Sequence, residues 1–80
     1  MHELGLARNI VGIVGDHARG RRVSRVRLVV GPHACVEEEA VRFCFDVVSE
    51  QTVLAGARLE FLPGEGDAFV IKDFDMEEMV

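Results

Sequence analysis

The first two residues of the chain carry the groups and the spacing of a small metal chelate. Met1 supplies an α-amino nitrogen, and His2 supplies a backbone nitrogen and an imidazole directly beside it. These three nitrogens can close adjacent small rings around one ion. A nitrogen-rich planar set suits Ni(II) or Cu(II) better than Zn(II), which prefers a tetrahedron. The bulky second residue favours retention of Met1. By itself the pattern also occurs in many proteins that bind no metal, so the rest of the chain must decide its meaning.

The other soft or nitrogen ligands have simpler explanations. His17 falls near the end of the first expected helix, where the helix dipole favours a cation, so we expect a capping role. His33 falls in a turn and is expected to be exposed. Cys35 and Cys44 are nine residues apart without any CxxC pair, a spacing that fits neither a disulfide framework nor a zinc site. We therefore expect reduced, partly buried thiols.

The charged residues are unevenly distributed. The run Glu37–Glu39 is typical of the first turn of a helix, where the dipole favours negative charge, and Asp73–Glu78 is expected to be an acidic tail. A net charge of −5 argues against a general nucleic-acid binder. One local cluster keeps that alternative open, although the solvated outer face of a strand explains it better; its members are Arg19, Arg21, Arg22, Arg25 and Arg27.

Length and composition predict one small domain. A chain of 80 residues buries only about 60% of the surface that its unfolded form exposes, so partners are plausible. The chain has no Trp or Tyr, so its five Phe residues are expected to supply the large groups of the core. The sequence contains no run of about 18 apolar residues, so no membrane span is expected. The N-terminus lacks the basic and then apolar order of a signal peptide, and we expect a cytoplasmic protein.

Hydrophobic periodicity predicts the first half of the fold. Apolar residues at three- and four-residue steps predict a helix over His2–Ala18, which Gly20 ends. Val23–Val30 changes to a period of two and is expected to be a strand with one face on the core. A second helix is expected to start near Val36. Its apolar stripe is centred on Val36, Ala40, Phe43, Cys44 and Val47, and it is wide because Val41, Phe45 and Val48 flank it.

The second half is expected to consist of strands. Ala57–Leu62 alternates and predicts a strand, Pro63–Gly66 has the residues of a tight turn, and Asp67–Met76 predicts a final strand. Apolar residues on both faces of that last strand favour a central position in the sheet. The predicted class is α+β, with a small three-stranded sheet flanked by two helices in the order helix, strand, helix, strand, strand. We expect the last two strands to form an antiparallel hairpin, and the first two strands to be joined through the second helix by a right-handed crossover.

Several ordered blocks resemble one known family. They cover essentially the whole chain, and they are Met1–Leu4, Val26–Gly31, Cys35–Glu37, Ala40–Val48, Gly56–Glu60, Gly66–Asp67 and Phe69–Lys72. On these blocks the chain resembles the HypA family of hydrogenase accessory proteins, which deliver nickel to NiFe hydrogenase. The order of the blocks is more specific than any one of them.

The sequence departs from the family pattern in one place. Family members normally carry a zinc-binding insertion with two CxxC pairs between the last two strands. Here Phe61–Pro63 continues almost directly into Gly64–Gly66. We therefore expect a single nickel-binding type of domain over residues 1–80, without the zinc module and without structural zinc. Either a natural variant or a deliberate deletion would explain the missing insertion.

The resemblance implies a function for the N-terminus. It implies a Ni(II) site at His2, with Met1 and Glu3 as the other metal residues, the latter through its backbone nitrogen or as an acceptor that orients the imidazole. It also implies a metallochaperone and not an enzyme, with the hydrogenase maturation GTPase and the hydrogenase large subunit as partners. The alternative is a metal-independent module for docking or for formation of a homodimer, such as a shortened relative of the family. No nucleic acid or membrane is expected as a partner.

Overall fold

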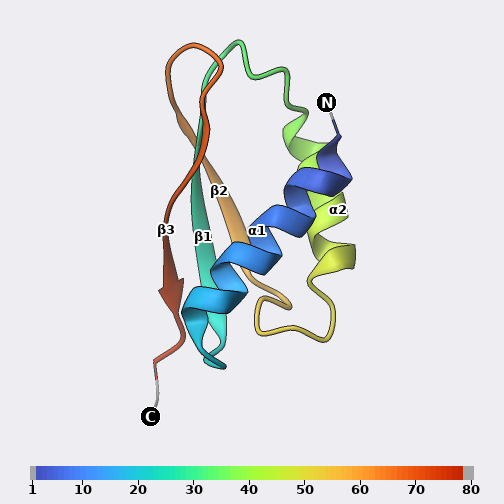
Figure 1. Cartoon of the computed structure of the whole chain (residues 1–80), viewed down its shortest axis with the longest axis vertical. Helices are drawn as coiled ribbons and strands as arrows, with labels where there is room; N and C mark the ends of the chain where they lie inside the picture. Colours follow the sequence, from blue (N-terminus) through green and yellow to red (C-terminus); the bar gives the residue numbers. More distant parts are fainter. Residues whose placement is uncertain (1, 79–80) are drawn as a thin grey trace.

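The computed structural model describes residues 2–78, and its elements follow the predicted α+β order (Figure 1). They are α1 (Glu3–Ala18), β1 (Val23–Val30), α2 (Glu38–Val48), β2 (Arg58–Pro63) and β3 (Phe69–Met76). The bounds of β1 are those predicted from its alternating pattern. Within residues 2–78 no helix is long and apolar enough to cross a membrane.

Helix α1 begins after His2 and ends in a left-handed turn. Arg19 has a φ of 53° and Gly20 a φ of 85°, which confirms the predicted end of the helix. The buried side chains recur at three- and four-residue steps and are Ala7, Ile10, Val14 and Ala18. Leu4 and Ile13 belong to the predicted apolar stripe, yet they are exposed. The buried stripe is therefore narrower than the apolar pattern suggested.

Helix α2 begins at Glu38, two residues later than predicted. Glu37 is its N-cap residue, and two glutamates follow in the first turn, as expected from the helix dipole. The predicted centre of its apolar stripe was wrong, because Val41 and Phe45 are buried whereas Phe43 and Val47 are exposed. The apolar residues cover more than half of the helix surface, opposite a charged face that includes Arg42 and Asp46. Periodicity alone therefore did not determine which part of this wide stripe packs on α1 and the sheet.

The sheet has the strand order β2-β1-β3. Strand β1 pairs with β2 in parallel, which confirms that the two are joined by a crossover through α2. It pairs with β3 antiparallel. The predicted hairpin of the last two strands was wrong, because β1 lies between them. Strands are spaced by about 4.8 Å, so a five-residue connection is long enough to cross one intervening strand as well as to turn back.

The connection over residues 64–68 passes across the C-terminal end of β1. The Gly64 N–H donates to the Val30 carbonyl at 2.9 Å, and the Gly31 N–H donates to the Ala68 carbonyl at 2.8 Å. The backbone of the connection lies so close to Gly31 that a Cβ at this position would clash with the carbonyl oxygens of Glu65 and Gly66. A glycine at the end of β1 thus permits the crossing.

Strand β3 is at an edge of the described sheet, so its predicted central position was also wrong. The apolar run Phe69–Ile71 suggested a central strand, but its side chains lie on two different faces of the sheet. Phe69 and Ile71 pack against the core, whereas Val70 points to the opposite face and is 53% exposed.

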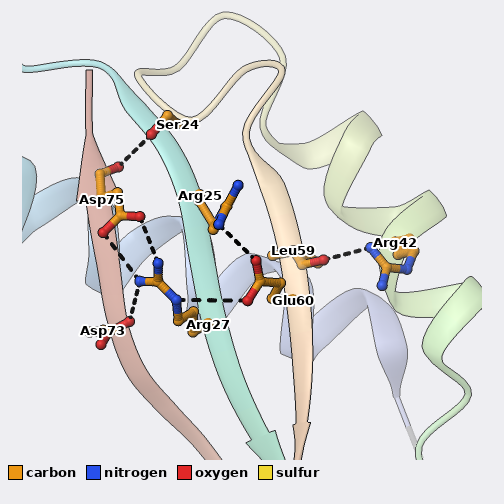
Figure 2. A network of polar contacts seen from close by, with 8 residues as sticks. All are labelled: Ser24, Arg25, Arg27, Arg42, Leu59, Glu60, Asp73 and Asp75. Carbon is orange, nitrogen blue, oxygen red and sulfur yellow. Dashed lines mark hydrogen bonds and ion pairs between the residues drawn. The ribbon is translucent and has the colours of Figure 1, made fainter. Parts of the chain in front are cut away.

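Both helices cover the same face of the sheet, and the core lies between these two layers (Figures 1 and 2). The largest fully buried side chains come from every layer and include Ile10, Leu28, Phe45 and Leu54. Over residues 2–78 the opposite face carries no helix, and charged side chains occupy much of it (Figure 2). One face of the sheet thus packs in the core, and the other is in contact with solvent.

Candidate functional site

The N-terminus of α1 presents the residues that the sequence selected for metal binding. Met1 lies outside the described residues. His2 is the N-cap residue of α1, and its carbonyl accepts a hydrogen bond from the Leu6 N–H at 3.0 Å. The His2 side chain is exposed and makes no capping hydrogen bond. Its imidazole is therefore available to solvent, while its backbone is held by the first turn of the helix.

Glu3 is the first residue of α1 and is half-buried. The first N–H groups of a helix have no partner within the helix, so the backbone nitrogens of His2 and Glu3 are not used by the hydrogen-bond ladder. The positive end of the helix dipole disfavours a cation there. The carboxylate of Glu3 lies in the first turn and offsets this effect, and the same field favours loss of a proton from a backbone amide.

Between His2 and Glu78 no group of three or more His, Cys, Asp or Glu side chains is arranged to hold a metal ion. A site built from side chains alone is therefore not present in this part of the chain. A metal at the N-terminus has to use nitrogen atoms of the backbone or of the terminal amine beside the His2 imidazole. The ligand set expected from the first two residues stays a prediction, because Met1 lies outside the described residues.

The two other histidines have the roles expected from the sequence. His17 is in the last turn of α1, where its Nδ1–H donates to the carbonyl of Ile13 at 2.8 Å. His33 is exposed in the loop after β1, and its backbone N–H donates to Gly66 at 2.8 Å.

The two cysteines differ from each other. Cys44 is half-buried and packs against the core, as predicted. Cys35 was expected to be partly buried as well, but it is exposed, with a φ of 56° in the loop before α2. It lies on the wall of an open hollow of about 800 Å³ between that loop and the end of β2. The local sequence gave no sign of this exposure, because an apolar neighbour, Val36, follows it.

Two members of the arginine cluster, Arg25 and Arg27, pair with carboxylates on the helix-free face (Figure 2). Arg27 of the central strand contacts Asp73 at 2.9 Å and Asp75 at 2.8 Å, and Arg25 contacts Glu60 at 2.9 Å. These contacts confirm that the two arginines belong to the solvated outer face of a strand. The sequence had suggested an acidic tail from Asp73 onward. Asp73 and Asp75 instead belong to strand β3.

The charge of this network affects the protonation of its members. Hydrogen bonds from Arg27 hold the pKa of Asp75 below its ordinary value, and the same bonds raise the pKa of Arg27. Both groups therefore stay ionised at neutral pH. A compensated network of this kind offers little unpaired positive charge to a phosphate backbone.

Sequence reasoning missed two apolar residues on the surface of α2. Phe43 is 71% exposed and Val47 is 53% exposed, and they are one helical turn apart. They were predicted as core residues because the whole helix is rich in apolar side chains.

Comparison with known proteins identifies the family of the chain and agrees with its fold. The family model for hydrogenase/urease nickel incorporation, metallochaperone, hypA matches residues 1–69. The chain belongs to the HypA family. A hydrogenase maturation factor HypA from Nostoc punctiforme is 50% identical over 68 residues, covering 82% of this chain and 60% of the relative. The corresponding factor from Beijerinckia indica is 45% identical over 83 residues, covering 100% of this chain and 71% of the relative.

A solved HypA structure has the same fold. The solution structure of the Ni metallochaperone HypA from Helicobacter pylori has a TM-score of 0.69 at 16% identity, over 80% of this chain and 58% of that one. The chain spans about 60% of the length of the first HypA relatives that it matches. Family membership thus applies to the part of a HypA protein that this chain spans. The activity of the longer HypA proteins is a separate question, and for this chain it is a proposal.

Proposed function

We propose that this HypA-family chain binds Ni(II) at its N-terminus and delivers it during maturation of NiFe hydrogenase. The proposed ligands are the Met1 amine, the His2 backbone nitrogen and imidazole, and a further backbone nitrogen from Glu3. The main support is the exposed His2 imidazole at the N-cap of α1, which makes no capping hydrogen bond. The family description, nickel incorporation and metallochaperone, agrees with it.

This site suits transfer better than permanent storage. It consists of a terminal segment at the surface, and the ligands must lose protons before they bind. A planar arrangement of nitrogens favours Ni(II) and also Cu(II), which ranks above Ni(II) in affinity for such ligands. The proposed role is that of a carrier without catalysis, acting in the cytoplasm. Its proposed partners are the hydrogenase maturation GTPase and the large subunit of the hydrogenase.

Nickel titration of the untagged chain tests the site directly. Wild-type protein should bind one equivalent of Ni(II) by calorimetry and give the visible absorption of a planar, nitrogen-ligated nickel centre. His2→Ala should lose both signals while its circular dichroism stays unchanged, because the exposed side chain contributes little to packing. His33→Ala is the matched control, since it removes an exposed histidine far along the chain. Equal nickel affinity in His2→Ala and the wild type would rule out the proposed ligand set.

The second candidate is a docking module that works without metal. The exposed pair Phe43 and Val47 on α2 favours it, because large apolar side chains in adjacent turns form a typical contact for a partner. Pull-down of the maturation GTPase, with and without nickel, separates the two functions. Capture that depends on Phe43 and not on nickel supports docking, whereas capture only in the presence of nickel supports delivery.

A further inference from the structure

The two edges of the sheet are protected to different degrees. On β2, the Arg42 Nη1 of α2 donates to the Leu59 carbonyl at 2.6 Å (Figure 2), and its guanidinium lies 4.8 Å from the centre of the Phe61 ring. A side chain therefore already occupies the backbone of that edge. Strand β3 forms the other edge, and no side chain of residues 2–78 makes a comparable hydrogen bond there.

The hydrogen bonds at the ends of β3 identify its outward groups. The Glu77 N–H donates to the Arg22 carbonyl, and the Ala68 carbonyl accepts from Gly31, both at 2.8 Å. Backbone groups of an antiparallel strand alternate in direction. Counting inward from these two ends, the groups that point away from β1 belong to Phe69, Ile71, Phe74 and Met76. All four side chains pack against the core on the helix-covered face.

A β-bulge in the middle of β3 makes this edge selective. Leu28 is opposite Ile71 and Arg27 is opposite Asp73, so Lys72 is an extra residue in the ladder. Outward positions are consequently two residues apart within each half of the strand but three apart across the bulge. An ordinary strand, with its period of two, can match one half or the other, and a bulge of this kind normally discourages edge pairing.

A second copy of the same strand has the matching spacing. We propose that β3 pairs antiparallel with β3 of a second copy of this chain, with the two bulges facing each other at the two-fold axis. In this register Phe69 is opposite Met76 of the second copy, and Ile71 is opposite Phe74. Each outward backbone group meets another outward group, and apolar side chains meet on one face. Lys72 is opposite Asp73 of the second copy, so the charges are complementary as well.

The hollow beside β3 fits the same arrangement. Antiparallel pairing about an axis perpendicular to the sheet keeps the helices of both copies on one face of a six-stranded sheet. The space between α1 and β3 has a volume of about 420 Å³ and is lined by Leu6, Ile10, Ile13, Phe69 and Ile71 among others. Ile13 is 50% exposed on its rim. The second copy would cover this apolar surface along the seam, which adds a hydrophobic contribution to the strand pairing.

Amide exchange tests the pairing in the intact chain. Sedimentation should show reversible dimers as the concentration rises toward about 1 mM, the weak range for a small interface. Over the same range, exchange of the Phe69, Ile71, Phe74 and Met76 amides should slow by about tenfold or more. The inward amides of Val70, Asp73 and Asp75 are the internal control, because β1 protects them at every concentration. A monomer throughout, or a dimer in which the four outward amides exchange unchanged, would overturn the inference.

A charge variant tests the register independently. Lys72→Asp places like charges opposite each other twice at the dimer axis, and the dissociation constant should rise about tenfold or more. Lys72→Arg keeps the charge and should dimerise like the wild type. Lys72 is exposed, so neither change should alter the thermal unfolding of the monomer. Equal association of the Asp and Arg variants would refute the register. The nickel titration above is not involved, so this inference and the proposed function can fail separately.

Discussion

Arg27 of the central strand forms two hydrogen bonds with Asp75 of β3, from Nη1 to Oδ1 at 3.1 Å and from Nη2 to Oδ2 at 2.8 Å (Figure 2). The pair joins residues 48 positions apart in sequence. A bidentate contact between guanidinium and carboxylate is stronger and more directional than a single ion pair. It fastens the last strand of the chain to β1 on the face that has no helix.

This pair predicts a pH-dependent contribution of Asp75 to stability. Arg27 lowers the pKa of Asp75 in the folded state, so stabilisation is present above the unfolded pKa of about 3.9 and is lost as the pH falls through the lower folded value. Asp75→Asn should be less stable than the wild type at pH 7, and the difference should shrink toward zero in strong acid. Urea unfolding at both pH values measures it. Asp67→Asn, an exposed acid in the connection, should show no such difference; a gap for Asp75→Asn that persists in strong acid would contradict the mechanism.

Two glycines predict opposite effects of an added methyl group. Gly31→Ala should destabilise the chain by about 2 kcal/mol or more, because the new Cβ collides with backbone oxygens of the connection rather than with a movable side chain. Gly12→Ala in α1 meets nothing within 4 Å and should stabilise it by about 0.5–1 kcal/mol through helix propensity. Thermal unfolding of both variants is the measurement. If Gly31→Ala unfolds like the wild type, the connection does not press on β1 as described.

The thiols should react at different rates. Cys35 is exposed and Cys44 is half-buried against the core, so a thiol reagent under native conditions should modify Cys35 first and Cys44 only slowly. Mass spectrometry of peptides taken at successive times resolves the two sites. In denaturant the rates should become similar, because the protection of Cys44 comes from packing. Equal rates in the native protein would show that α2 is packed differently.

The proposed nickel site predicts its own pH dependence. Binding requires an unprotonated terminal amine, whose ordinary pKa is about 7.7–8.0, and loss of a backbone amide proton. Apparent nickel affinity should therefore fall by at least about tenfold for each pH unit below this range. A short N-terminal extension should abolish specific binding at every pH, since it converts the amine into a peptide bond. Calorimetry of tagged and untagged protein distinguishes this from a side-chain site, which the extension would leave intact.

Local patterns in the sequence were sufficient to predict the elements, and they also selected the candidate N-terminal ligands, which stay a prediction. Alternation in Val23–Val30 and the steps of three and four in α1 depend on near neighbours, as do the acidic start of α2 and the position of His2 beside the first helix. The resemblance in ordered blocks, confirmed by the family match, depended on the same local information. Each of these features is set by residues within one or two turns of each other.

Tertiary contacts decided the strand order, the buried side of α2 and the partners of the arginines. The residues 64–68 are compatible with a hairpin, and only the packing of their backbone over Gly31 carries β3 to the far side of β1. Likewise, α2 is apolar on several sides, and its contacts bury Phe45 while leaving Phe43 exposed. The charge of Arg27 is visible in the sequence, but its neutralisation by Asp75 depends on that strand order. Such outcomes arise from competition between distant surfaces, which a local pattern does not record.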